Sequence, residues 1–136
     1  MGVGGYTRNT GLTRQYVVPG MSSGNFKDLP EIQEVECWPG IKETDMKLLS
    51  VSLYRVPGNS ALVLLNVLTN SCLTHGEYSS CIIDTSDSRN SKVRVLVSDL
   101  EEGESRTFGC DVKAFTSRGE TTKSTTSLVV TRHSKL

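Results

Sequence analysis

Net charge, histidine and long apolar runs are all scarce in this sequence, and each scarcity excludes a class of function. Fifteen Lys and Arg residues balance fifteen Asp and Glu residues, so the 136-residue chain has a formal net charge of zero. A neutral chain lacks the positive surface that binding to nucleic acid phosphates requires. The longest apolar stretch, residues 61–68, is too short to span a bilayer. We therefore expect neither a nucleic acid partner nor a membrane-spanning segment.

Catalytic and metal-binding patterns are also missing. The sequence has two histidines: His75 lies within the polar Cys72–Cys81 segment and His133 in the C-terminal tail, so we interpret both as exposed polar residues rather than as members of a catalytic triad. It contains no glycine-rich phosphate loop and no nucleophile elbow. The cysteines form no Cys-x-x-Cys pair of the kind that zinc sites favour, and the acidic residues lack the spacing of a calcium loop. The sequence predicts a protein that is not an enzyme and has no cofactor or metal.

Four cysteines, Cys37, Cys72, Cys81 and Cys110, form an even set that allows three disulfide connectivities. The alternative is that some of them are free buried thiols in a cytosolic protein. We favour two disulfides, because the cysteines occur at strand positions described below. Two disulfides imply an oxidising compartment, and hence an extracellular protein.

Short segments with alternating apolar residues follow one another from Pro30 onward, with turn residues between them and no helical period. Residues 46–56 are expected to place Leu49, Val51 and Leu53 on one face. Periodicity alone would allow residues 60–68 to form a buried helix, but their length and the preceding Pro-Gly favour a strand. The pattern predicts an all-β fold, an antiparallel two-sheet sandwich. Strands are expected near residues 31–38, 46–56, 60–68, 91–100, 106–115 and 121–132.

The first 27 residues differ in composition from the rest. They are rich in Gly, Ser, Thr and Asn, and such a segment buries too little surface to offset the entropy of ordering it. We expect residues 1–27 to be a flexible leader, with residues 16–18 as its one edge strand at most. The folded domain is expected over residues 28–132, followed by a short tail, residues 133–136.

Two of the cysteines lie on the apolar faces of alternating strands. In a two-sheet sandwich the apolar faces oppose one another, so a Cys37–Cys110 bridge fits the gap between the sheets. A Cys72–Cys81 bridge would close a small polar loop and hold its flanks together as a hairpin-like cap.

Residues 97–110 resemble the corresponding segment of immunoglobulin domains. They contain Leu100, an acidic turn with Gly103, and an aromatic residue, Phe108, two positions before Cys110. The resemblance implies an immunoglobulin-like sandwich. The family usually has tyrosine in place of Phe108, so the tyrosine-corner hydrogen bond must be absent. The family's core tryptophan is also missing, because the single tryptophan, Trp38, directly follows Cys37 and should point to the opposite face.

Residues 30–132 more weakly resemble the immunoglobulin domains of molluscan fibrinogen-related proteins. The similarity lies in a leucine-rich strand followed by a second apolar strand (KLLSVSLYRVPGNSALVLLNVLTN) and a late cysteine strand. It implies a secreted, lectin-like protein of innate immunity, in which this domain is linked to further domains. No binding residues carry over from that resemblance.

Sandwich domains generally bind through loops at one end or through an exposed sheet face. We favour the Cys72–Cys81 segment as the binding site, because a covalent staple lowers the entropic cost of ordering it. The alternative is that the bridge merely stabilises a long loop. Tyr54 and Trp38 are secondary candidates, and either could instead pack under the leader. The residues that the favoured segment displays are Leu73, His75, Glu77 and Tyr78.

The sequence thus predicts an extracellular recognition domain of receptor, adhesion or immune-lectin type, which binds a protein or glycan on a cell or pathogen surface. The alternative is a structural spacer within a larger extracellular protein, without a ligand of its own. Protease inhibition is a remote third reading, with Leu73 as the residue that would enter a protease pocket. Fold alone does not choose among these functions.

Overall fold

Nine strands and one short 3₁₀-helix make up the regular structure of the computed structural model, which describes residues 17–43, 45–75 and 78–133. Within these residues no helix is long or apolar enough to cross a membrane. The elements are β1 (Gly20–Phe26), β2 (Leu29–Trp38), β3 (Lys47–Val56), β4 (Ala61–Asn66), β5 (Ser71–Thr74), β6 (Ser79–Ile82), η1 (Ser88–Asn90), β7 (Lys92–Val97), β8 (Ser105–Phe115) and β9 (Thr121–Thr131).

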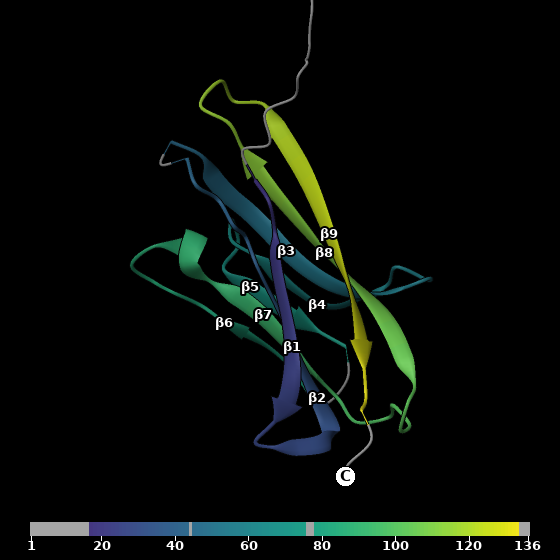
Figure 1. Cartoon of the computed structure of the whole chain (residues 1–136). Coiled ribbons are helices and arrows are strands. Elements are labelled where there is room, and N and C mark those ends of the chain that lie inside the picture. The colour runs from purple at the N-terminus through teal and green to yellow at the C-terminus, as the bar shows by residue number, and fades with distance from the viewer. Residues whose placement is uncertain (1–16, 44, 76–77, 134–136) are drawn as a thin grey trace, which may run out of the picture.

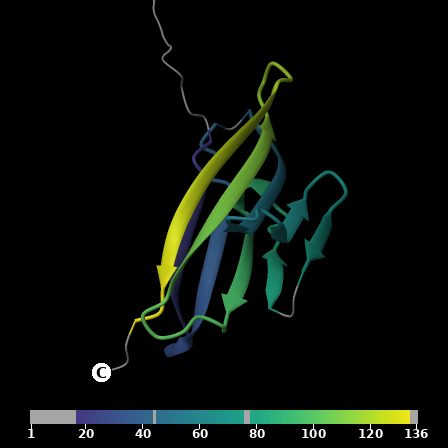
Figure 2. The same cartoon turned by 90° about the vertical axis from the view of Figure 1, so that its right-hand side faces the viewer.

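The strands form two antiparallel sheets that pack face to face (Figures 1 and 2). One sheet has the order β1-β2-β7-β6, and the other has the order β5-β4-β3-β8-β9. The antiparallel two-sheet sandwich expected from the sequence is confirmed. In immunoglobulin terms this order is that of a variable-type domain, in which two additional strands extend the sheet that contains the late cysteine strand.

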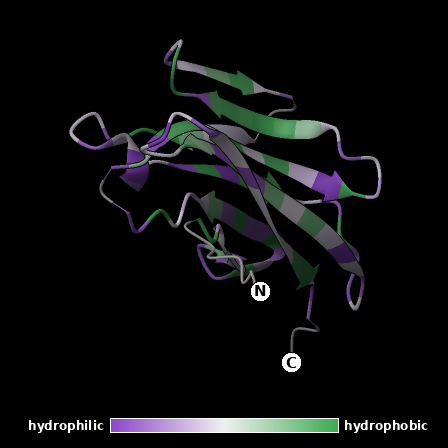
Figure 3. Ribbon diagram, turned by 90° about the horizontal axis from the view of Figure 1, so that it is seen from above, coloured by the Kyte–Doolittle hydropathy of each residue, from purple (hydrophilic) through white to green (hydrophobic). Residues whose placement is uncertain are grey.

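The core lies between the sheets and is filled by the inward side chains of alternating strands. Hydrophobic and hydrophilic bands succeed one another along these strands (Figure 3). Cys37 of β2 and Cys110 of β8 are fully buried at the centre and form a disulfide with a Cα–Cα distance of 6.0 Å. The expected link between the sheets is therefore present. Other buried side chains are Val35, Val51, Leu53, Val63, Leu65, Val93, Val95, Val97, Leu100, Phe108, Val112, Ala114 and Val130.

A β-bulge changes the expected face of one leucine. The register of β3 against β8 shifts between Leu48 and Ser50, so Leu49 is an extra residue on β3. Leu48 consequently occupies the buried position, with 3% of its surface exposed, and Leu49 lies outside the core. The prediction that Leu49 faces the core was wrong, because one inserted residue reverses the alternation on its N-terminal side. Val51 and Leu53, beyond the bulge, are buried as expected.

Residues 17–26 belong to the sandwich rather than to a leader. Strand β1 pairs with β2, and the turn between them contains two residues with positive φ, Lys27 and Asp28. Such a pair of residues is typical of a tight hairpin. Val17 is buried and forms a bridge to Ile41, whereas Tyr16, the start of the expected edge strand, lies outside the described residues, as do the other residues of 1–16 and residues 134–136. The strand escaped prediction because four consecutive residues, 22–25, are Ser, Ser, Gly and Asn and are all exposed, so the sequence shows no apolar alternation there.

The second disulfide, Cys72–Cys81, is also present, with a Cα–Cα distance of 6.1 Å. It does not close a hairpin, because its two strands belong to different sheets. Cys72 of β5 pairs with Leu65 of β4, whereas Cys81 of β6 pairs with Val93 of β7. The expected hairpin-like cap was therefore wrong: the bridge joins the edges of the two sheets, and the chain crosses from one sheet to the other between its cysteines.

The two disulfides should differ in their contribution to stability. The chain segments that they close have sequence separations of 73 and 9 residues. The longer loop loses more entropy in the unfolded chain, so we expect the Cys37→Ala/Cys110→Ala double variant to lose about 4 kcal/mol and Cys72→Ala/Cys81→Ala about 2.5 kcal/mol. Urea unfolding without reductant measures both losses. Equal losses, or a larger loss for the Cys72–Cys81 variant, would contradict the central role of the Cys37–Cys110 bridge.

Candidate binding site

The side of the sandwich between β5 and β6 carries three of the four binding residues that the sequence analysis favours, Leu73, His75 and Tyr78. We call residues 68–75 and 78–83, with their disulfide, the bridged edge. Its crossing segment is attached to both sheets through the backbone. The His75 amide donates to the Leu62 carbonyl at 2.9 Å, and the Leu96 amide donates to the Tyr78 carbonyl at 2.9 Å. Together with the disulfide, these bonds fix both flanks of the segment.

Exposed apolar side chains are concentrated on the bridged edge. Among the described residues, ten large hydrophobic side chains are exposed, and five of them lie between residues 68 and 83. Leu73 and Tyr78 are 56% and 53% exposed. Exposed apolar side chains that are concentrated in one part of a surface are typical of interaction sites. The other three are Leu68, Ile82 and Ile83.

A hollow of about 270 Å³ lies at one end of the bridged edge. His75 and Tyr78 line it together with Leu62 of β4, and the buried ring of Phe108 also contributes. The structure therefore brings two of the four predicted binding residues together. Leu73 lies instead on the outer face of the five-stranded sheet, opposite Leu64, and Glu77 lies outside the described residues.

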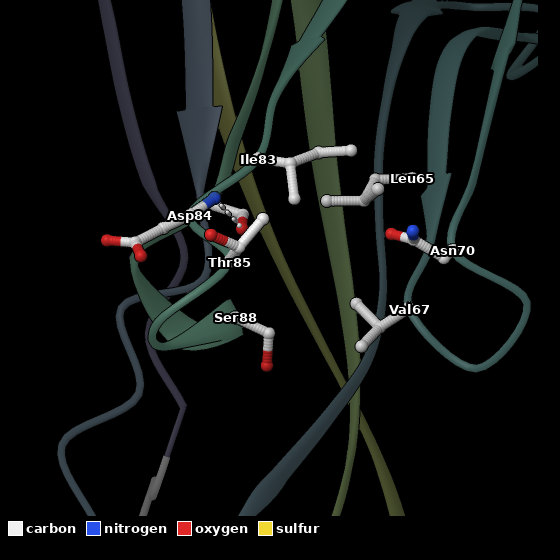
Figure 4. A pocket seen from close by; sticks show the side chains of 8 residues that line it. Leu65, Val67, Asn70, Ile83, Asp84, Thr85 and Ser88 are labelled. Carbon is white, nitrogen blue, oxygen red and sulfur yellow. Dashed lines mark hydrogen bonds between the residues drawn. The ribbon is translucent and has the colours of Figure 1, made fainter.

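A second hollow, of about 380 Å³, lies at the other end of the bridged edge (Figure 4). Leu65 and Ile83 point toward each other across it, and Val67 adds to its apolar part. The carboxylate of Asp84 points away from these side chains. The sequence did not single out this hollow, because its two walls come from different sheets and no local pattern links them.

Asp84 has a structural part in the turn beside this hollow. Its Oδ1 accepts hydrogen bonds from the Ser86 hydroxyl at 2.6 Å, the Ser86 amide at 2.9 Å and the Asp87 amide at 3.1 Å. The Ser86 hydroxyl is the main cause that lowers the pKa of the Asp84 carboxyl. A carboxylate stabilised in this way remains ionised and does not act as a general acid near neutral pH. No group of three potential metal ligands occurs in the part of the chain that the structure describes.

An ion pair forms the rim of the hollow around His75. Asp99 lines it together with Arg55, and the Asp99 carboxylate accepts from Arg106 at 2.7 Å and from Arg55 at 3.4 Å. The hydrogen bond from Arg106 is the largest of the causes that lower the pKa of Asp99. The charges at the rim are therefore compensated by one another.

The two secondary candidates lie on opposite outer faces. Tyr54 packs over Gly109, where a Cβ atom would overlap its ring, and its hydroxyl donates to Asp111 at 2.8 Å. Burial, followed by the hydrogen bond to Asp111, raises the pKa of Tyr54 to about 12. Trp38 lies on the four-stranded sheet and packs against Gly20, a residue of the expected leader. Tyr54 is thus tied to its own sheet, whereas Trp38 depends on β1 for its position.

No known family model matches the sequence, and no curated protein matches it. Solved structures do resemble the fold. The structure of murine CRIg superposes with a TM-score of 0.57 and 12% sequence identity, over 87% of this chain and 99% of that chain. At this identity the likeness concerns the fold alone, and it confirms the immunoglobulin-like sandwich.

The close packing of Tyr54 on Gly109 makes a testable contrast between two glycines. In Gly109→Ala the new methyl group must displace the Tyr54 ring from its contact, and we expect a loss of about 1–3 kcal/mol in the free energy of unfolding. Gly24→Ala on β1 introduces the same group where no atom lies within 4 Å, so a change of about 0.5 kcal/mol or less is expected. Urea unfolding compares the two, and similar losses would refute the contact.

The Asp99 ion pair should stabilise the fold only where the carboxyl is ionised. Because folding lowers its pKa, the contribution is present above the pKa of the unfolded chain and is lost as pH falls through the lower, folded value. We expect Asp99→Asn to cost about 1 kcal/mol or less at pH 7, since the carboxylate is largely exposed, and nothing at a pH low enough to protonate Asp99 in the folded protein as well. Thermal unfolding from pH 7 downward tests the loss, with Glu102→Gln as a control, because Glu102 forms no ion pair with any described residue.

Proposed function

We propose that this immunoglobulin-like sandwich is an extracellular recognition domain that binds a protein partner through the bridged edge. The observation that carries the proposal is the concentration of exposed apolar side chains there, Leu73 and Tyr78 among them. Two disulfides support an oxidising, extracellular location.

The physical character of the bridged edge fits a protein surface. Its apolar groups are held on a backbone that a disulfide and two hydrogen bonds already fix, so little ordering entropy is lost on binding. Tyrosine is enriched among the residues that dominate binding energy at such surfaces. The hollow beside Ile83 has the apolar lining to accept a side chain of the partner.

The finer aspects of the function belong to the same proposal. The domain would act in a receptor, an adhesion molecule or a secreted immune lectin, linked to further domains, with a ligand on a cell or pathogen surface. The innate-immune variant rests on the weak sequence resemblance of residues 30–132 to the immunoglobulin domains of molluscan fibrinogen-related proteins. His75 at the rim of the hollow would contribute polar contacts, and no catalytic step is proposed.

The test is a binding screen of the fluorescently labelled, tetramerised full chain against purified extracellular domains and intact cells. We expect Leu73→Ser and Tyr78→Ser each to weaken the binding of any ligand found by about tenfold to a hundredfold, because each removes a central apolar contact. Val129→Ser is the matched control, because Val129 is 60% exposed on β9 and lies outside the bridged edge.

An equal loss in Val129→Ser would contradict the assignment of the bridged edge. If the wild-type domain binds no surface or protein, the spacer function is correct instead. Unfolding curves should be unchanged in all three variants, since the altered side chains are exposed.

A further inference from the structure

The single tryptophan of the chain stands beside a hollow on the outer face of the four-stranded sheet. The hollow has a volume of about 500 Å³. The Cε2, Nε1 and Cζ2 atoms of Trp38 occupy the place where a Cβ on Gly20 would stand, so the indole rests directly on the β1 backbone. Even so, Trp38 remains 36% exposed. Aromatic surface is thus held in place and presented to solvent.

The charged groups of this hollow are paired with one another or with immediate neighbours. Lys92 Nζ lies 3.2 Å from Glu36 Oε1. Arg89 makes a two-pronged contact with Asp87, with Nε–Oδ1 at 3.0 Å and Nη2–Oδ2 at 2.8 Å, and its Nη1 donates to the Glu43 carbonyl. The hollow therefore offers fixed hydrogen-bond donors and acceptors beside an aromatic ring, with its charges balanced.

This combination selects a ligand that is both uncharged and amphipathic. An anion or cation would find no unpaired charge of opposite sign in the hollow. A purely apolar group would bind poorly, because it would displace water from the Lys92–Glu36 pair without forming hydrogen bonds in its place. A pyranose ring has one face of C–H groups that can lie on an indole and hydroxyl groups at its rim that bond to carboxylate and ammonium groups. We infer that the hollow formed by Trp38, Glu36, Lys92 and Arg89 binds a neutral sugar residue of a glycan.

This site extends the proposed recognition function to a second class of ligand on a different surface. It is built by β1, β2 and β7 of the four-stranded sheet and by η1, and it shares no residue with the bridged edge. A failure of sugar binding therefore leaves the protein-binding proposal intact, and the reverse also holds.

Because the chain has one tryptophan, its indole N–H gives a single NMR signal that reports on this site alone. The full chain should be titrated with the methyl pyranosides of glucose, galactose, mannose and N-acetylglucosamine to about 50 mM, since a shallow site for one sugar binds in the millimolar range. We expect saturable shifts of the Trp38 indole and the Lys92 amide. Sorbitol, which has hydroxyl groups but no ring, should cause none.

Two results of this titration would overturn the inference. One is the absence of a saturable shift with all four pyranosides. The other is tighter binding of glucuronic acid than of methyl glucoside, because a preference for the carboxylate would mean that an unpaired positive charge controls the site.

Two variants test whether Trp38 and Lys92 contact the sugar. Trp38→Ala should abolish the sugar-induced shift of the Lys92 amide, and Lys92→Ala should weaken binding about tenfold by removing a charged hydrogen-bond partner. Arg94→Ala is the matched control, because Arg94 pairs with Glu34 at 3.1 Å on the same two strands but does not line the hollow. Binding that survives Trp38→Ala, or that falls equally in Arg94→Ala and Lys92→Ala, contradicts the site. Amide spectra of the free variants establish that each is folded.

Discussion

The covalent link between Cys37 and Cys110 is the constraint on which the remaining structure depends. It joins an inner strand of each sheet, β2 and β8, and the remaining strands are paired outward from these two. Both cysteines are fully buried, so neither strand can slip by one residue without turning its cysteine, and with it a whole row of apolar side chains, toward solvent. The buried side chains around the link are aliphatic apart from Phe108, so this core is packed without the tryptophan that is typical of immunoglobulin domains.

Much of this fold was predictable, and the exceptions have physical causes. Strands with one buried face, such as β7 and β8, are recognisable in the sequence because apolar and polar residues alternate along them. The same alternation predicted that Cys37 and Cys110 face each other across the core. An edge strand such as β1 is held by backbone pairing and carries no such signal. The bulge at Leu49 depends on the register between two strands, and a residue count along one strand does not contain that information. The spacing of Cys72 and Cys81 indicated that they meet but not which sheet each strand joins.

The two proposed binding surfaces differ in how far the sequence revealed them. The short span between Cys72 and Cys81 was enough to bring His75 and Tyr78 together, because a disulfide limits where the intervening residues can go. Exposure was not predictable, since an isoleucine such as Ile83 looks like a core residue until the sheets are placed. Because Trp38 directly follows Cys37 in a strand, the sequence correctly predicted that its side chain points away from the core. The hollow beside it could not be predicted, because it combines segments that are about fifty residues apart in the sequence. One surface is apolar and rigidly stapled, whereas the other is polar, charge-balanced and aromatic.

The long covalent loop also has a mechanical consequence. If the chain is pulled from its two ends, the disulfide transmits tension directly from β2 to β8, and the residues between Cys37 and Cys110 cannot extend. Their separation of 73 residues corresponds to roughly 250 Å of chain that force alone does not release. The bridged edge lies entirely inside this protected loop. Gly20, on which the indole of Trp38 rests, lies outside this loop. Pulling on the chain would therefore separate β1 from β2 and disrupt the hollow beside Trp38, whereas the bridged edge would keep its structure.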